Sequence, residues 1–333
     1  MPKRQLIVPF VILLAALAGL NAWVGFRART LPRLILQRID QTPRADFLAL
    51  GNSLVAADFR PETFQAALPP GLESQVMLNV GCGGTLPAET LQFYQAANKK
   101  FPHIRCVVQG LMFTQLTAPA KAQWKELTGN RAMFYYADFE LGLAQYEPDS
   151  AFSNLQFRLT RWFPLVYERL NLWRHVELLR RNFDRLGLRA AETTTFGRVS
   201  DFETDPFQPA NPEVLAEECR RVLNEHRGLS RPVLETIRQA RQSGSTVIFV
   251  QMPLPRARRE YFHADGVWAD YRHHLRGLLE AEGAIYIDAL DWVSDDSRSF
   301  MDNAHLKRAG AEEFSRRIAP VIADKMLEVE KQR

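Results

Sequence analysis

Three side chains near the two ends of the chain are of the types that together perform acyl-group chemistry. Ser53 follows an apolar run and a glycine, in the order Phe47-Leu48-Ala49-Leu50-Gly51-Asn52-Ser53. Asp302 and His305 stand three positions apart near the C-terminus. A serine hydroxyl becomes a nucleophile when a histidine takes its proton, and a carboxylate orients that histidine. The sequence therefore predicts a catalytic set of Ser53, His305 and Asp302, provided that the fold brings the two ends together.

The spacing of Asp302 and His305 does not by itself distinguish this histidine from the others. The chain has seven histidines, and His263 and His273 also follow a carboxylate by three positions. What distinguishes His305 is its predicted place in a loop between the last strand and the last helix. A loop allows Asp302 to accept from one ring nitrogen of His305 while the other nitrogen faces a serine.

The elements that must position these residues follow a regular alternation of short apolar runs and longer amphipathic ones. Strands are predicted at Asp46 to Leu50, Val76 to Val80, Ile104 to Val108, Thr246 to Val250 and Ala284 to Ile287. Helices are predicted at Pro61 to Ala67, Pro87 to Asn98, Pro212 to Gln242, Val267 to Glu282 and Ala309 to Glu328. Alternation of this kind predicts a three-layer, flavodoxin-like α/β fold, with a parallel sheet covered on both faces.

Sites in such sheets lie beyond the carboxyl ends of the strands. Ser53 follows the first strand there, and Gly81-Cys82-Gly83-Gly84 follows the second. Acyl transfer needs hydrogen-bond donors for the developing oxyanion, and glycines let backbone N–H groups approach a ligand closely. The cluster lacks the Gly-x-Gly-x-x-Gly spacing of a dinucleotide site. The backbone N–H of Ser53 is a candidate donor, although the glycines also fit a plain turn.

Two further residues follow the fourth predicted strand and are candidate substrate contacts. Gln251 comes directly after Val250, and Arg256 lies five positions beyond Gln251. Both are expected near the same edge of the sheet as Ser53.

Residues from about 113 to 211 interrupt the alternation and are interpreted as a helical insert between the third and fourth strands. Between Phe157 and Leu188, aromatic and aliphatic residues recur at near-helical spacing with arginines interleaved. This pattern fits an amphipathic helix that covers the core, and it also fits a lid or a surface that meets a membrane.

The first 30 residues are predicted to be a membrane anchor or a signal peptide. Leu6 to Val24 carries no charge and follows Lys3 and Arg4. A membrane-crossing helix needs about 20 apolar residues, which favours a transmembrane anchor. Ala16-Leu17-Ala18 has the small-x-small form of a cleavage site, which favours a signal peptide. In both cases residues 31–333 form an exported domain.

Composition limits the other function classes. The chain has 333 residues, 46% of them hydrophobic, which is enough for a substantial core. The net charge of +4 comes without a concentrated basic tract, so nucleic acid is not an expected partner. Its three cysteines have no metal-like spacing. No metal and no organic cofactor is implied.

These motifs resemble those of the SGNH, or GDSL-type, hydrolase superfamily. Gly51-Asn52-Ser53 looks like its first block, with Asn in place of the usual Asp. Asn79-x-Gly81-x-Gly83-Gly84-Thr85 is similar to the second block, and Asp302-x-x-His305 to the fifth. The resemblance implies an SGNH hydrolase fold, with Ser53 as the nucleophile, His305 as the base and Asp302 as its partner. It also implies an oxyanion hole formed by Ser53 and Gly84.

One block departs from the superfamily pattern. The third block normally carries Gly-x-Asn-Asp, whose Asn supplies an oxyanion donor, whereas this chain has Gln109-Gly110-Leu111-Met112. Exported subgroups that act beside membrane-bound O-acyltransferases, such as the alginate O-acetylation and teichoic acid D-alanylation proteins, share this missing Asn and an N-terminal anchor. In these two features the chain resembles those subgroups.

That narrower resemblance implies an exported serine esterase or O-acyltransferase. Its substrate would be a small acyl ester or the acetyl groups of a cell-envelope or exported polysaccharide. A multi-pass O-acyltransferase is the candidate partner. The protein would lie in the cytoplasmic (inner) membrane as a single-pass protein, with the catalytic domain on the periplasmic or extracellular side. The alternative is a non-catalytic assembly or carbohydrate-binding subunit that kept the fold.

Overall fold

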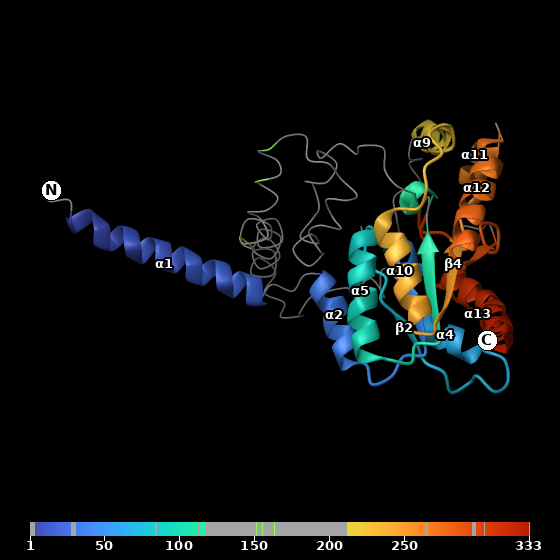
Figure 1. The fold of residues 1–333 in the computed structure, drawn as a ribbon, viewed down its shortest axis with the longest axis horizontal. Coiled ribbons are helices and arrows are strands. Elements are labelled where there is room, and N and C mark those ends of the chain that lie inside the picture. Colours follow the sequence, from blue (N-terminus) through green and yellow to red (C-terminus); the bar gives the residue numbers. More distant parts are fainter. Residues whose placement is uncertain are drawn as a thin grey trace.

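The structure is a computed structural model of the chain (Figure 1). It describes residues 4–27, 31–83, 85–111, 113–117, 151, 155, 163, 212–263, 266–294, 298–302 and 304–332. The predicted helical insert, at about 113–211, lies outside the described residues except for 113–117 and three single positions.

A five-stranded parallel sheet forms the centre of the domain. Its strands are β1 (Phe47–Leu50), β2 (Met77–Asn79), β3 (Cys106–Leu111), β4 (Thr246–Gln251) and β5 (Ile285–Asp288). The order β2-β1-β3-β4-β5 is that of flavodoxin-like folds. The predicted parallel α/β sheet is confirmed, with each strand within a few residues of its expected place.

Burial explains why these short segments form strands. Every residue of β1, β3 and β4 is buried, and β1, residues 106–108 of β3 and residues 247–250 of β4 are continuous apolar runs rather than alternating ones. Such runs are typical of parallel strands that have helices on both faces. β2 and β5 are the outer strands of the sheet. The predicted site lies beyond the carboxyl ends of the inner strands β1, β3 and β4.

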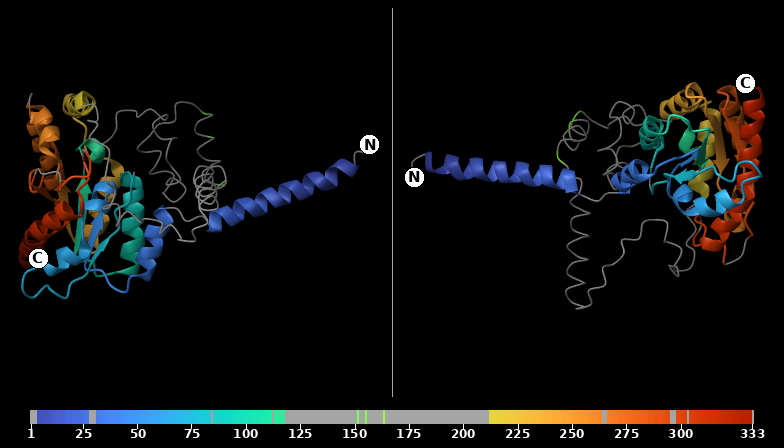
Figure 2. Two further views of the ribbon diagram at one scale, coloured as in Figure 1. Left: turned by 180° about the vertical axis from the view of Figure 1, so that it is seen from behind. Right: turned by 90° about the horizontal axis from the view of Figure 1, so that it is seen from below.

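Helices cover both faces of the sheet (Figures 1 and 2). In chain order they are α1 (Arg4–Arg27), α2 (Leu31–Gln41), α3 (Ser53–Asp58), α4 (Pro61–Ala66), α5 (Pro87–Lys100), the 3₁₀ turn η1 (Phe113–Leu116), α9 (Pro212–Asn224), α10 (Arg231–Gln242), α11 (Arg256–His263), α12 (Val267–Ala281) and α13 (Arg308–Gln332). α5 packs against α2 and α10 in one layer, and α13 packs against α3 and α4 in another. The C-terminal helix α13 therefore brings the chain end back to the elements that follow β1.

The helix predicted from Pro212 to Gln242 is two helices, α9 and α10. The chain turns at His226, which has a left-handed backbone with φ of 49°, and continues through Gly228. Arg227 holds this turn because its buried guanidinium pairs with Glu218 and Glu225. α10 then begins with a proline in its first turn, a position that suits proline.

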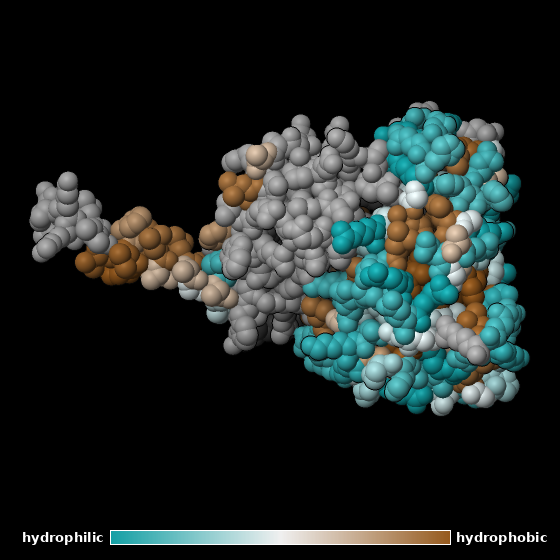
Figure 3. All heavy atoms as spheres, in the orientation of Figure 1, coloured by the Kyte–Doolittle hydropathy of each residue, from teal (hydrophilic) through white to brown (hydrophobic). Residues whose placement is uncertain are grey.

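The predicted N-terminal helix is present as α1, which extends away from the sheet domain (Figure 1). Its large apolar side chains are exposed, as the brown surface of Figure 3 shows. In the part of the chain that the structure describes, none of the helices combines the length and the apolar character that a membrane crossing requires. The membrane anchor or signal peptide expected within the first 30 residues stays a prediction.

Candidate functional site

The turn after β1 places Ser53 at the edge of the sheet. Gly51 has φ of +149°, a backbone conformation that L side chains rarely adopt, so glycine is required there. Its carbonyl oxygen accepts from the backbone N–H of Cys82 over 3.0 Å and from Oγ1 of Thr85 over 2.8 Å. The loops that follow β1 and β2 are thus joined beside Ser53.

Ser53 is the first residue of α3, and Asn52 caps that helix. Oδ1 of Asn52 accepts from the N–H of Leu54 over 2.9 Å, which satisfies one of the donors that a helix start leaves free. Nδ2 of Asn52 donates to Oε1 of Gln115 over 3.0 Å. Asn52 therefore caps the helix of Ser53 and also ties it to η1, beyond β3.

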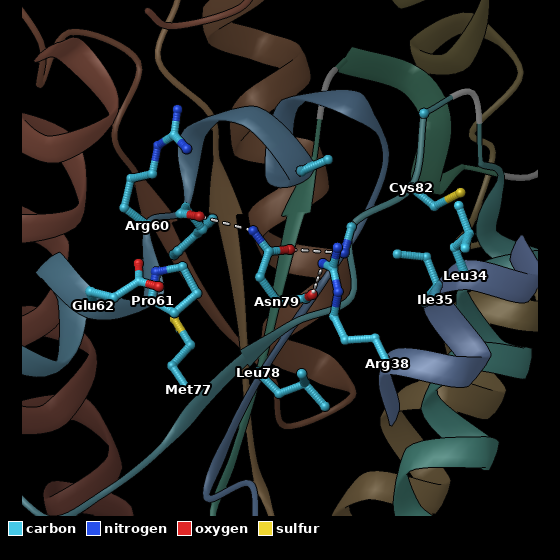
Figure 4. Close-up of a pocket in the computed structure, with 14 residues that line it drawn as sticks. Leu34, Ile35, Arg38, Arg60, Pro61, Glu62, Met77, Leu78, Asn79 and Cys82 are labelled. Carbon is cyan, nitrogen blue, oxygen red and sulfur yellow. Dashed lines mark hydrogen bonds between the residues drawn. The ribbon is translucent and has the colours of Figure 1, made fainter. Parts of the chain in front are cut away.

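Asn79, at the end of β2, fixes the other side of α3 (Figure 4). Its Nδ2 donates to the carbonyl oxygens of Val55 and Phe59 over 2.8 and 2.9 Å, and its Oδ1 accepts from the N–H of Gly81. A Cβ on Gly81 would lie 2.4 Å from the backbone N of Ala56, so this loop touches the helix backbone. The residues of the second sequence block therefore hold α3 in place.

The loop before α13 carries the predicted base. Oδ1 of Asp302 accepts from the backbone N–H groups of Ala304 and His305, each over 2.8 Å. Phe300 and Leu306 form an antiparallel bridge that closes the loop. The N–H of Leu306 donates to Oδ1 of Asp58, at the end of α3, over 3.0 Å. This network orients the His305 ring toward α3.

The structure brings Ser53, His305 and Asp302 into one hydrogen-bonded chain. Oδ2 of Asp302 lies 2.8 Å from Nδ1 of His305, and Nε2 of His305 lies 2.8 Å from Oγ of Ser53. With Nδ1–H donating to the carboxylate, Nε2 is the acceptor for the serine hydroxyl. This is the arrangement that a serine nucleophile with a histidine base requires.

The charges at the site favour a basic imidazole. Burial tends to lower the pKa of His305, but the hydrogen bond and negative charge of Asp302 outweigh it and hold that pKa above its ordinary value. Burial tends to raise the pKa of Asp302, but the hydrogen bonds from His305 outweigh it and leave that pKa below its ordinary value. Asp302 is therefore ionised and His305 is a stronger base than a free imidazole.

The structure places the other predicted site residues in different surroundings. Gly84, the predicted second oxyanion donor, lies outside the described residues. The backbone N–H of Ser53 belongs to the first turn of α3, where N–H groups lack helical partners. Gln251 is buried at the end of β4. Arg256 is an exposed residue of α11, with a side chain 73% accessible that pairs with Glu260. The structure therefore places Arg256 on the solvent side, because its i, i+4 partner lies on the same face of the helix.

Three residues near the triad did not emerge from the sequence. Asp58 and Gln115 contact its supporting loops, and the charge of Arg258 acts on both Asp302 and His305. Burial lowers the pKa of Arg258 from its ordinary value, and the charge of Asp302 partly offsets this. Each residue comes from a separate element, so only the folded chain shows that they share a site.

A separate cavity of about 310 Å³ lies on the far side of α3, beside the edge strand β2 (Figure 4). Leu34 and Ile35 of α2 form part of its wall, and Arg38 of α2 donates to the carbonyl oxygen of Asn79 there. Among the described residues, no group of three or more His, Cys, Asp or Glu side chains could hold a metal ion.

Comparisons with known proteins identify no family. No family model matches the chain, and no curated protein matches it. Among solved structures, a provisionally named acylhydrolase from Bacteroides fragilis NCTC 9343 matches with a TM-score of 0.39 and 10% identity, over 87% of this chain and 95% of the other. A provisionally named arylesterase from Agrobacterium tumefaciens str. C58 matches with a TM-score of 0.35 and 14% identity, over 84% and 99%. At these values neither likeness carries a conclusion about activity.

Proposed function

We propose that the protein is a serine esterase or acyltransferase that works through an acyl ester of Ser53. The observation that carries this proposal is the continuous chain from Oγ of Ser53 through the His305 ring to the Asp302 carboxylate. Superfamily membership is part of the proposal. It is supported by the sequence blocks, which here surround Ser53 and His305 in one site.

The chemistry follows from the roles of these atoms. Nε2 of His305 takes the hydroxyl proton as Oγ of Ser53 attacks the acyl carbonyl carbon. The imidazolium is stabilised by Asp302 and then gives the proton to the departing alcohol, which leaves Ser53 acylated. In the second half, His305 activates water or an acceptor hydroxyl, which takes the acyl group and frees the serine. The N–H of Ser53 is a donor to the oxyanion in both halves.

A covalent probe tests the nucleophile directly. Full-length protein in detergent micelles is treated with a fluorophosphonate, and the modified residue is located by peptide mass spectrometry. We expect one adduct on Ser53, absent in Ser53→Ala and slowed by roughly 10³-fold or more in His305→Ala. Ser243→Ala is the matched control, since Ser243 is an exposed serine at the end of α10. Equal labelling of wild type and Ser53→Ala would exclude Ser53 as the nucleophile.

The acyl group and acceptor form a finer part of the proposal. We propose acetyl groups of a cell-envelope or exported polysaccharide, with a multi-pass O-acyltransferase as partner, because the sequence resembles the subgroups that act in such systems. Hydrolysis of p-nitrophenyl acetate alone indicates an esterase. Faster release of p-nitrophenol with an added oligosaccharide, together with acetylated oligosaccharide, indicates transfer. If wild type and Ser53→Ala support equal polymer acetylation in cells, the non-catalytic subunit is the better interpretation.

We also propose that the domain is exported and attached to a membrane through contacts of α1 with lipid. The support is the exposure of apolar side chains at consecutive positions, such as Ile12, Leu13 and Leu14, which point in different directions around the helix. A helix with apolar side chains exposed on several sides is suited to contact with lipid acyl chains.

Cysteine labelling tests this location. The native residues Cys82, Cys106 and Cys219 are buried, so a new exposed cysteine is labelled selectively. Lys331→Cys, on the exposed end of α13, is treated with a membrane-impermeant maleimide in intact cells. We expect labelling without lysis and recovery in the membrane fraction. Labelling that requires lysis would contradict export.

A further inference from the structure

Asp58 is a fully buried carboxyl group that the proposed acyl transfer does not use. It is the last residue of α3, the helix that begins at Ser53. Its Oδ1 accepts from the backbone N–H of Leu306 over 3.0 Å, and Leu306 directly follows His305. One short helix therefore carries the nucleophile at its start and the acceptor for the His305 loop at its end.

The end of α3 that carries Asp58 is itself held by α13. Oγ of Ser315 donates to the backbone carbonyl oxygen of Asp58 over 3.2 Å. The same Oγ accepts from the N–H of Arg60 over 2.8 Å. Because α13 begins just after the His305 loop, the helix that follows this loop is also fixed against the end of α3.

Hydrogen bonds thus join α3 to the His305 loop at both ends of the helix: Ser53 with His305 at 2.8 Å, and Asp58 with Leu306 at 3.0 Å. The first must break and re-form during acyl transfer, since the serine proton leaves Oγ. The second involves no reacting atom and can persist through the whole cycle. It is therefore suited to keep the imidazole in place while the first contact is broken.

We propose that Asp58 is a positioning residue: its buried carboxyl group holds the backbone of Leu306, and so keeps the His305 ring at the distance from Ser53 that proton transfer requires. This inference rests on the proposed function of Ser53 and His305 as nucleophile and base. It assigns Asp58 no contact with the substrate.

The environment of Asp58 also couples it electrically to His305. Burial raises the pKa of Asp58 to about 8, although the hydrogen bond from Leu306 and the charge of His305 oppose the shift. Its Oδ2 is buried and has no hydrogen-bond partner among the described residues. Asp58 therefore changes between its neutral and its charged form in a pH range that overlaps the titration of His305, whose pKa is also raised.

Charged groups from several elements act on His305 and Asp58. His305 feels Asp302 from its own loop, Asp58 from α3 and Arg258 from α11, and Asp58 also feels Arg60. Negative charge on Asp58 raises the pKa of His305, and protonation of His305 favours ionisation of Asp58. The two titrations are therefore linked, and removing one must move the other.

The test compares Asp58→Asn and Asp58→Ala with a matched control, Asp46→Asn. In Asp58→Asn the carboxamide oxygen can still accept from Leu306 but the group does not ionise, whereas alanine removes the acceptor. Asp46 is also buried and accepts a backbone N–H, that of Val76 over 2.8 Å, but it precedes β1, at the opposite end of the strand from Ser53. All proteins are full length in detergent micelles. Thermal unfolding is measured for each, and only variants with a cooperative unfolding transition are compared.

Two readouts are measured on each variant. The first is the pH profile of kcat/KM for p-nitrophenyl acetate. The second is the titration of the His305 ring by NMR, which needs no turnover. For Asp58→Asn we expect kcat at pH 7 within about threefold of wild type, and a lower His305 midpoint than in wild type. For Asp58→Ala we expect kcat to fall by about 10- to 10²-fold with little change in KM, because the base is misplaced.

The outcomes separate this inference from the proposed function. An Asp58→Asn protein whose His305 midpoint equals that of wild type would overturn the coupling. Unchanged kcat in folded Asp58→Ala would overturn the positioning role. Asp46→Asn should keep the wild-type His305 midpoint, and a shift as large as that in Asp58→Asn would count against the inference. If no variant and no wild type hydrolyses the ester, the proposed function fails. The NMR comparison then still decides the link between Asp58 and His305.

Discussion

Asn52 and Gln115 are joined by a hydrogen bond of 3.0 Å from Nδ2 to Oε1, across 63 positions of sequence. Asn52 directly precedes Ser53 and caps its helix, whereas Gln115 lies in the turn that follows β3. The contact therefore links the turn that carries Ser53 to the turn after β3. The carboxamide of Asn52 uses its oxygen to cap α3 and its nitrogen to hold η1.

Replacing Gln115 should weaken the Ser53 turn. Gln115→Leu removes the acceptor for Nδ2 of Asn52, a residue only 6% exposed, and an unsatisfied buried donor costs about 1–3 kcal/mol. We expect the free energy of unfolding to fall by up to this amount, and ester turnover to fall with it. Gln115→Glu keeps an acceptor oxygen and should lose less of both. Denaturant unfolding measures the stability, and initial rates measure the ester turnover. Equal stability of Gln115→Leu and Gln115→Glu would show that the hydrogen bond between Asn52 and Gln115 is not needed.

The pH dependence of turnover should report His305. Its pKa is held above the ordinary value mainly by Asp302 against the effect of burial, and the neutral ring is the active base. The kcat/KM of wild type should therefore rise with pH, with a midpoint above about 6.5. Asp302→Asn should move the His305 midpoint down, because the negative partner is gone.

Turnover of Asp302→Asn should also fall, by roughly 10³–10⁴-fold, since the ring loses the partner that fixes its tautomer. NMR titration of the His305 ring measures the midpoint, and single-turnover acylation measures the rate. A midpoint that stays at the wild-type value would mean that Asp302 does not control the base.

The sheet and the triad were predictable from the sequence because both depend on local patterns. Fully buried parallel strands are continuous apolar runs, so β1 and β4 stand out without any tertiary information. Ser53 and His305 follow strands, and in a parallel sheet such positions meet at one edge. The distance between Ser53 and His305 itself could not be predicted, since it depends on the packing of α13 against α3.

The residues that sequence analysis missed act through contacts that have no local pattern. Asp58 meets Leu306 from 248 positions away, and nothing in its neighbours indicates a buried carboxyl group. Arg256 was predicted as a substrate contact because it follows β4, but the arginine of α11 whose charge acts on Asp302 and His305 is Arg258. The helix predicted from Pro212 to Gln242 was wrong at one point: the chain breaks at His226, and Gly228 and Pro232 are the local signals of that break.

A glycine substitution tests whether close packing of α3 is needed. A Cβ at Gly81 would meet the backbone of Ala56 at 2.4 Å, so Gly81→Ala must displace the helix of Ser53 or the loop after β2. We expect a loss of about 1–3 kcal/mol in the free energy of unfolding and a larger relative loss of turnover. Gly277→Ala is the control: its Cβ has no atom within 4 Å, and alanine favours the α12 helix.

In that pair, the control should be as stable as wild type or slightly more stable, with unchanged turnover. Denaturant unfolding and ester hydrolysis are measured on both variants. If Gly81→Ala matched wild type in both measurements, the contact between the second block and α3 would not determine the position of Ser53.

The last prediction concerns stability rather than turnover. Burial raises the pKa of Asp58 from 3.8 to about 8, so between these pH values the folded chain keeps a proton that the unfolded chain has lost. The free energy of unfolding must then decrease as the pH rises through this window. Asp58→Asn has no such group, so its stability relative to wild type should increase from pH 4 to 8, on the order of a few kcal/mol, and level off above 8.

Urea unfolding of the two full-length proteins at a series of pH values measures this difference. Any constant effect of the amide, such as a poorly placed NH₂ group, shifts the whole curve without changing its slope. The slope therefore isolates the ionisation of the buried carboxyl group from its hydrogen bond with Leu306. A difference that stays flat from pH 4 to 8 would show that Asp58 is ionised in the folded protein over this range. In that case it would act on His305 as a permanent second negative charge beside Asp302.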